Sequence, residues 1–198
     1  VVKPTRLSGS RGVIRADDAE QLALAIERVR HILASDGVDL ASALLVVEPF
    51  VPGFEVAVEG LLTDGELTVL AIFDKPDPLD GPFFEETIYV TPSRLPQGVQ
   101  EAITRTTEQA ARALGLRTGP VHAELRVNER GPWVIEVAGR SIGGLCSRIL
   151  EFGTSMTLEE LILAPAVGGW RIAAPVGAAL DREQGRVVAA EAGDGVQN

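Results

Sequence analysis

Hydrophobic residues recur at helical spacing in several parts of the chain. After Asp17, which we expect to be an N-cap, the recurring positions are Leu22, Ala25, Ile26, Val29 and Ile32. A second helical pattern covers residues 99–114 and ends at Gly115, a typical helix-terminating glycine. A capping pattern from Thr157 to Glu160 predicts a last helix.

Runs of β-branched and aromatic residues predict strands between these helices. FEVAVEGLL and ELTVLAIF flank a turn at 63–65, and VHAELRV and WVIEVA flank a turn at 128–131, so each pair predicts a hairpin. LLVVEPFV at 44–51 predicts a buried strand that ends at Pro52. Because neighbouring strands pair antiparallel and helices lie between them, we expect an α+β fold.

Charge and composition exclude several classes of protein. A net charge of −10 leaves no basic surface for nucleic acid or an anionic membrane, and no apolar run reaches the ~20 residues of a membrane-spanning helix. The single cysteine, Cys146, rules out an internal disulfide and lies in an apolar run, which favours a core position. We therefore expect a soluble, cytoplasmic protein that binds neither nucleic acid nor membrane.

Two glutamates are predicted to face each other across the second hairpin. Strand alternation places His122, Glu124 and Arg126 on one face, and a turn near Arg130 sets Glu124 opposite Glu136. Opposed carboxylates with Cβ atoms ~5 Å apart repel, so a cation is expected between them. Mg²⁺ is usually held by one or two carboxylates together with substrate phosphates. A register that differs by one residue is the alternative, and it would leave two solvated surface glutamates.

The opening residues combine a lysine with a glycine loop. A strand that carries Lys3 breaks and resumes at Val13, and the small residues between are Ser8, Gly9, Ser10 and Gly12. Glycine amides can approach phosphate oxygens closely and a nearby lysine adds positive charge, as a nucleotide would require. The spacing fits neither the Walker pattern nor G-x-G-x-x-G, and an ordinary turn between two strands is the alternative.

The segment LVVEPFVPGFEV adds two carboxylates, Glu48 and Glu55. The exposed backbone of such a segment can pair with the edge of adenine, and Phe50 or Val51 can pack on the ring. A carboxylate can accept hydrogen bonds from ribose hydroxyls. A solvated acidic edge is the alternative for this segment considered by itself.

Taken in order, three motifs resemble the ATP-grasp fold of carboxylate-amine ligases, a family that includes biotin carboxylase and the L-amino acid ligases. They are VVKPTRLSGSRGV, LVVEPFVPGFEV and HAELRVNERGPWVIEVAGRSIGG, and the similarity spans residues 1–168. EVAGRSIGG and Phe84-x-Glu86 are most similar to the amino-acid ligase branch. The resemblance implies ATP and Mg²⁺ as cofactors, with Mn²⁺ as an alternative ion. It also implies a lid subdomain over 1–50 and a C-terminal subdomain over 51–168, and it leaves 169–198 as an unassigned tail.

The resemblance assigns the nucleotide to the first two motifs. Lys3 matches a strand lysine that contacts the phosphates, and residues 8–12 match the mobile loop that folds over them. Glu48 matches the residue that begins the adenine-binding segment, whose backbone at residues 50–51 meets the base. Glu55 falls near the ribose position.

The third motif carries the implied chemistry. Glu124 and Glu136 match the metal-binding carboxylates, and Arg140 matches the arginine that steadies the transferring phosphoryl group. Contacts to substrate amino or carboxyl groups are implied at Glu86, Gly143 and Gly144. In this mechanism a substrate carboxylate attacks the γ-phosphoryl group of ATP, and an amine then displaces phosphate from the acyl phosphate.

Two departures from the family pattern limit these expectations. Ala138 stands where many relatives have Asn, which argues against a second Mg²⁺ ion. The family has an N-terminal domain and a lysine-bearing lobe before the strand that begins here. We therefore expect a piece of a longer ligase that turns over poorly or not at all by itself. A non-catalytic nucleotide-binding or regulatory module is the alternative, and a homodimer is compatible with either.

Overall fold

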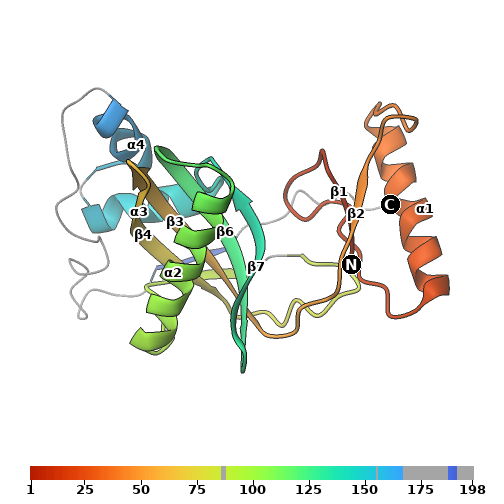
Figure 1. The fold of residues 1–198 in the computed structure, drawn as a ribbon, viewed down its shortest axis with the longest axis horizontal. Helices are drawn as coiled ribbons and strands as arrows, with labels where there is room; N and C mark the ends of the chain where they lie inside the picture. Colours follow the sequence, from red (N-terminus) through yellow and green to blue (C-terminus); the bar gives the residue numbers. More distant parts are fainter. Residues whose placement is uncertain (86–87, 155, 167–186, 191–198) are drawn as a thin grey trace. The chain divides into compact units, whose positions relative to one another are not determined.

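The computed structural model describes residues 1–85, 88–154, 156–166 and 187–190, and it divides into two compact units. The first unit comprises Val1–Pro52 with Leu79–Glu86, and the second comprises Gly53–Pro78 with Thr87–Asn198. Figure 1 labels most of the helices and strands by the names used below. The chain changes unit after Pro52 and returns to the first unit at 79–86, a return that the sequence analysis did not predict. The predicted subdomain boundaries after residues 50 and 168 stay predictions.

The first unit consists of a two-stranded antiparallel sheet and one helix. β1 (Val2–Pro4) pairs with β2 (Leu45–Val47), and α1 (Ala19–Ser35) contacts β1. The buried core of this unit consists of Val2, Ile14, Ala25, Val29 and Leu33. Three of these residues lie on successive turns of α1, so the helix has the apolar face that its sequence predicts.

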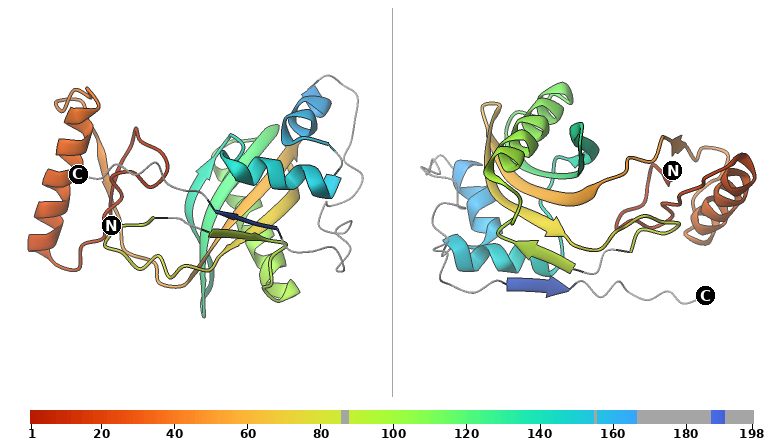
Figure 2. Two further views of the ribbon diagram at one scale, coloured as in Figure 1. Left: turned by 180° about the vertical axis from the view of Figure 1, so that it is seen from behind. Right: turned by 90° about the horizontal axis from the view of Figure 1, so that it is seen from below.

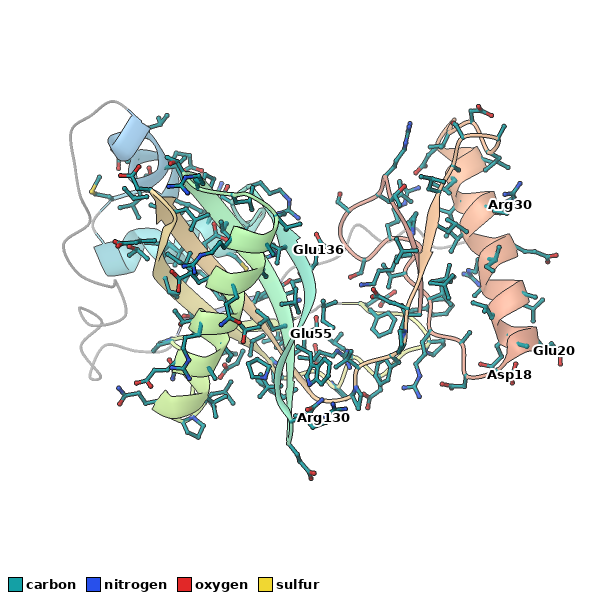
Figure 3. The ribbon with its side chains drawn as sticks, viewed as in Figure 1. Asp18, Glu20, Arg30, Glu55, Arg130 and Glu136 are labelled. Carbon is teal, nitrogen blue, oxygen red and sulfur yellow. The ribbon has the colours of Figure 1, made fainter. Side chains whose placement is uncertain are left out.

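The N-cap of α1 is Asp18 rather than Asp17 (Figure 3). The Asp18 side chain accepts a hydrogen bond from the backbone amide of Gln21 at 2.8 Å. The Gln21 side chain in turn accepts from the Asp17 amide at 3.1 Å. The Asp17 carboxylate instead pairs with Arg15, at 2.8 Å from its Nε. The predicted cap was therefore wrong by one residue.

Two strand predictions in the first unit were wrong. β2 is three residues long, and Val46 and Val47 are 42% and 55% exposed, so 44–51 is not a buried strand. Within the described ranges β2 pairs with β1 alone. The return strand of the expected opening hairpin is reduced to isolated bridges from Ile14 to Val2 and Phe83. Apolar composition predicted both strands, but burial depends on neighbours that a local pattern does not encode.

The second unit is an antiparallel sheet with helices on both faces. Its strand order is β7-β6-β3-β4-β5-β8. The strands are β3 (Phe54–Thr63), β4 (Glu66–Lys75), β5 (Ile88–Thr91), β6 (Gly119–Asn128), β7 (Gly131–Ala138) and β8 (Val187–Ala190). α2 covers one face and α3 and α4 cover the other (Figure 2). The helices are α2 (Gln97–Ala113), α3 (Leu145–Thr154) and α4 (Leu158–Ala166). The predicted α+β class is confirmed.

Strand alternation gives this sheet a core on each face. On the α2 face, Val56 of β3 packs in a cluster with Ile103 of the helix. On the opposite face, Ala57 and Phe73 cluster with Cys146 of α3. The burial of Cys146 confirms its predicted core position. Charged residues of β3, β4 and β6 that share this second face form the site described below.

Local signals correctly predicted the two hairpins of the second unit, the end of α2 and the start of α4. β3 and β4 are joined through Asp64 and Gly65, whose φ values of 56° and 93° are the left-handed pair that a type I′ turn requires. β6 and β7 form the second hairpin. α2 ends before Gly115, and α4 begins with reciprocal hydrogen bonds between Thr157 and Glu160.

Some predictions fall on residues that the structure does not describe. Glu86 and most of 169–198 lie outside the described residues, and β8 is the part of that tail that is described; it pairs with β5. The sequence analysis did not predict α3. Within the described part of the chain, no helix combines the length and apolar character needed to cross a bilayer.

Candidate active site

Glu124 of β6 lies directly opposite Glu136 of β7, in the predicted register. Paired residues of neighbouring strands project from the same face of a sheet, so the two carboxylates share a face. Nearer the turn the register differs by one residue, with Leu125 opposite Val134, and an irregularity between Glu124 and Leu125 restores the predicted pairing. The Glu124 side chain is 18% exposed, whereas that of Glu136, labelled in Figure 3, is 56% exposed. One carboxylate is therefore anchored inside the unit and the other faces solvent.

The two carboxylates fit a magnesium site that substrate completes. Mg²⁺ takes oxygen ligands and is usually bound through one or two carboxylates plus phosphate oxygens. Among the described residues, no group of three or more His, Cys, Asp or Glu side chains is arranged to hold a metal. Glu124 and Glu136 thus supply enough ligands for a metal–nucleotide complex and too few for a metal held by protein alone.

Two neighbours hold Glu124 as an ionised carboxylate. Its Oε1 lies 3.3 Å from Nζ of Lys75 and 3.4 Å from Nε2 of His122. Burial acts to raise the pKa of Glu124, but hydrogen bonding from His122 and the charge of Lys75 outweigh it and lower the pKa to about 2. Glu124 is therefore negatively charged at neutral pH, as a metal ligand must be.

Lys75 and Arg126 share the buried carboxylate of Glu55. Lys75 is 1% exposed, and its Nζ lies 3.0 Å from Oε1 of Glu55. Nε of Arg126 donates to Oε2 of Glu55 at 2.8 Å. The register explains both contacts, because Glu55 on β3 pairs with Lys75 on one side and Arg126 on the other. Lys75 thus links Glu55 to Glu124.

The surroundings of Glu55 bear on its predicted role. Both carboxylate oxygens bond to buried cations of the second unit, a contact set that the sequence analysis missed. A contact between Glu55 and a ribose remains a prediction. Lys75 was also missed, although a lysine closing the apolar run ELTVLAIFDK is an unusual end for a buried strand.

A further buried carboxylate, Glu59, borders this cluster. Its Oε2 accepts a hydrogen bond from the amide of Ile142 at 3.0 Å and lies 3.4 Å from Nδ1 of His122. Burial raises the pKa of Glu59, while His122, the Ile142 amide and the charge of Arg140 act in the opposite direction. Burial would lower the pKa of His122, but its contacts with Glu124 and Glu59 raise it to about 9. His122 is therefore a cation between two carboxylates at neutral pH.

Arg140 lies beside the exposed member of the carboxylate pair. Its Nη2 is 3.8 Å from Oε1 of Glu136, and its Nη1 donates to the carbonyl oxygen of Ser141 at 3.1 Å. Both partners of this ion pair are about half exposed, so the pair is weak and the guanidinium can turn to an anion. A Cβ at Gly143 would meet no atom within 4 Å, and Gly144 has a φ of 64°. The substrate contacts of these two glycines remain predictions.

Lys3 and the glycine loop, which are predicted to contact phosphates, lie in the first unit. Lys3 of β1 forms an ion pair with Glu48, directly after β2. The loop at 8–12 contains Gly9, Ser10 and Gly12 with φ values of 63°, 54° and 78°. This left-handed backbone favours glycine at positions 9 and 12. Because an ordinary turn shows the same geometry, the contact of this loop with phosphate stays a prediction.

Phe50 has its own partners in the first unit. The guanidinium of Arg15 lies 4.0 Å from the centroid of the Phe50 ring, and the ring of Phe84 stacks at 6.4 Å. Phe84 belongs to the segment that returns to this unit. The adenine contacts of Glu48 and of the backbone at Phe50 and Val51 remain predictions.

The chain belongs to the ATP-grasp domain family, whose sequence profile matches residues 1–149. It is 31% identical over 159 residues to the alanine-anticapsin ligase of Bacillus subtilis strain 168. The alignment covers 72% of this chain and 33% of that protein. The crystal structure of an L-amino acid ligase from Bacillus licheniformis is similar at 34% identity and a TM-score of 0.68, covering 86% of this chain and 39% of that one.

A more distant structure extends the similarity of fold. The biotin carboxylase domain of 2-oxoglutarate carboxylase from Hydrogenobacter thermophilus, solved with MgADP and bicarbonate, has a TM-score of 0.65 at 17% identity. The alignment covers 86% of this chain and 37% of that one. The predicted family and fold are therefore confirmed. The chain spans 33% of the ligase from Bacillus subtilis, about a third of its length.

Proposed function

We propose that this chain binds MgATP and forms the nucleotide-binding part of an ADP-forming carboxylate-amine ligase. The observation that carries the proposal is the register of β6 and β7, with Glu124 opposite Glu136 and Arg140 beside them. Similarity to an alanine-anticapsin ligase and an L-amino acid ligase supports an amino acid as one substrate.

The metal site is proposed to consist of Glu124, Glu136 and phosphate oxygens of ATP. A bound Mg²⁺ ion supplies charge neutralisation at the transferring phosphoryl group. Lys75 and His122 keep Glu124 ionised and fix its orientation. Arg140 donates hydrogen bonds to phosphoryl oxygens whose negative charge spreads in the transition state. Mn²⁺ is proposed to substitute at the same two carboxylates.

The nucleotide contacts are proposed from the family resemblance. Lys3 and the backbone of 8–12 bind phosphate oxygens, where a lysine point charge and unobstructed amides suit an anion. Adenine contacts the segment from Glu48 through the backbone at 50–51, and Glu55 serves the ribose. Substrate contacts are proposed at Glu86, Gly143 and Gly144.

The proposed reaction has two steps. A carboxylate oxygen attacks the γ-phosphorus of ATP, the bond to the bridging oxygen breaks, and ADP leaves an acyl phosphate behind. An amine nitrogen then attacks the acyl carbon, phosphate departs, and the nitrogen loses a proton to give the amide. Protein residues contribute mostly positioning and charge stabilisation to both steps.

Thermal unfolding with and without MgATP tests the binding step. We expect MgATP to raise the Tm by several degrees, because a ligand that binds the folded state and not the unfolded state stabilises the folded state. Glu136→Ala should abolish this shift. Glu129→Ala is the matched control, since Glu129 is an exposed carboxylate in the turn of the same hairpin. A wild-type chain without any shift at millimolar MgATP contradicts the proposal.

Phosphate release separates a ligase from a nucleotide-binding module. The protein at its full natural length should release phosphate from ATP only when a suitable pair of amino acids is present. Binding of MgATP without phosphate release, over a broad panel of amino-acid pairs, supports a regulatory module instead. The homodimer and the cytoplasmic location stay predictions, and light scattering tests the first of them.

A further inference from the structure

Glu59 has no part in the chemistry proposed above, yet it is fully buried, with 0% of its surface exposed. A carboxylate in the interior is costly unless it is paired and hydrogen-bonded. Its Oε1 is buried without a hydrogen-bond partner among the described residues. An apolar side chain of similar volume is often at least as stable at such a position. Fold stability alone therefore does not explain a glutamate here.

The other oxygen of Glu59 contacts two separate parts of the proposed site. Oε2 accepts from the amide of Ile142, which lies in the loop that carries Arg140. The same oxygen lies 3.4 Å from Nδ1 of His122, whose Nε2 lies 3.4 Å from Glu124. A single carboxylate oxygen thus connects the loop after β7 with the metal carboxylate on β6.

The sheet holds these connections in a fixed geometry. Glu59 pairs with His122 across β3 and β6, and His122 pairs with Ala138 across β6 and β7. β3 and β6 are interior strands of the sheet. Ile142 is itself buried in the core on the α3 and α4 face. Groups on packed strands are held more accurately than groups on loops.

We propose that Glu59 is a positioning residue of the ligase site. Through His122 it orients Glu124, and through the Ile142 amide it holds the loop that carries Arg140. This inference rests on the proposed function and deepens it. Residues that hydrogen-bond to metal ligands commonly fix the ligand orientation, and their loss lowers metal affinity by about 10- to 100-fold.

Mn²⁺ binding tests the connection to Glu124. Electron paramagnetic resonance measures free Mn²⁺ in a titration of the full-length protein with a non-hydrolysable ATP analogue. Glu59→Met removes both contacts at similar volume, and we expect Mn²⁺ affinity to fall by about 10-fold, the lower end of the range for direct partners of metal ligands, because Glu59 acts through His122. Glu59→Gln keeps an oxygen for both contacts and should recover most of the affinity.

Hydrogen exchange at the Ile142 amide tests the connection to the loop. We expect faster exchange in Glu59→Met, because the amide loses its acceptor, and near wild-type exchange in Glu59→Gln. Val58→Ala is the matched control for both measurements. Val58 is the preceding residue of β3, but it packs in the cluster on the α2 face, so its truncation destabilises the sheet without touching the site.

The inference is overturned if Glu59→Met retains wild-type Mn²⁺ affinity, if its Ile142 amide exchanges at the wild-type rate, or if Val58→Ala lowers the affinity equally. Should Glu59→Met not fold, Glu59→Asp withdraws the carboxylate by one methylene and should show both losses.

Glu136→Ala separates the two proposals. Unchanged Mn²⁺ affinity in Glu136→Ala contradicts the proposed function itself, whereas a loss there with normal Glu59 variants contradicts only the positioning role.

Discussion

At the scale of single residues, charges of opposite sign alternate across the second unit. Neighbouring members of this series lie 2.8 to 3.4 Å apart. The series runs Arg126, Glu55, Lys75, Glu124, His122 and Glu59. Buried charges of this kind are tolerated because each has an opposite charge beside it. Removal of one member should therefore cost more than removal of a surface charge.

Lys75→Met should strongly destabilise the second unit. The substitution leaves Glu55 and Glu124 without the ammonium that both contact, and loss of one partner of a buried ion pair costs about 3–5 kcal/mol. Urea unfolding measures the change. Arg105→Met is the control, because Arg105 pairs with Glu101 on the exposed side of α2 and should change stability little. Equal effects of the two substitutions contradict this explanation.

His122 should make stability depend on pH. The folded-state pKa of about 9 lies above the ordinary value of 6.5, so its contribution is full below about pH 6.5 and is lost as the pH rises through 9. The contribution of His122 to the free energy of unfolding is at most ~3 kcal/mol. Urea unfolding from pH 6 to 10 in EDTA, which keeps metal from Glu124, measures this slope. His122→Gln should flatten the slope, and a wild-type protein with a flat profile contradicts the expectation.

At the scale of elements, the predictions that held are those encoded by nearby residues. The turn at Asp64 and Gly65 requires left-handed backbone. The turn after Asn128 alone would set Glu124 opposite Ile135, and a register shift between Glu124 and Leu125 brings Glu136 opposite it instead. The apolar run that forms α3 was not assigned, because short apolar runs do not distinguish helix from strand. β2 was predicted to be buried, since the local pattern does not reveal whether a neighbour covers it.

The N-cap of α1 gives a test at this scale. Asp18→Ala should destabilise the first unit by about 1 kcal/mol, because the Gln21 amide loses its acceptor. Asp17→Ala should cost less, since Asp17 makes an exposed pair with Arg15. Chemical unfolding of both variants, followed by circular dichroism, compares the two aspartates. A larger loss at Asp17 would support the sequence-based assignment over the structural one.

At the scale of the whole molecule, part of the site could be predicted and part could not. Glu124 and Glu136 lie in one hairpin and were predicted to pair, and Arg140 comes shortly after them in the same motif. Glu59 was missed because its partner His122 lies on a strand far away in the sequence. Lys75 pairs with Glu55 within a predicted hairpin, but its contact with Glu124 depends on the pairing of β3 with β6. Single-sequence patterns carry no information about such pairings. The same reason explains why residues 79–86 were not predicted to return to the first unit.

Anomalous diffraction from crystals grown with Mn²⁺ and a non-hydrolysable ATP analogue tests the central claim most directly. The measurement locates the metal without any assumption about activity. We predict an anomalous peak coordinated by carboxylate oxygens of both Glu124 and Glu136 and by phosphate oxygens of the nucleotide. A nucleotide-bound structure whose metal lies away from these two glutamates would contradict the account.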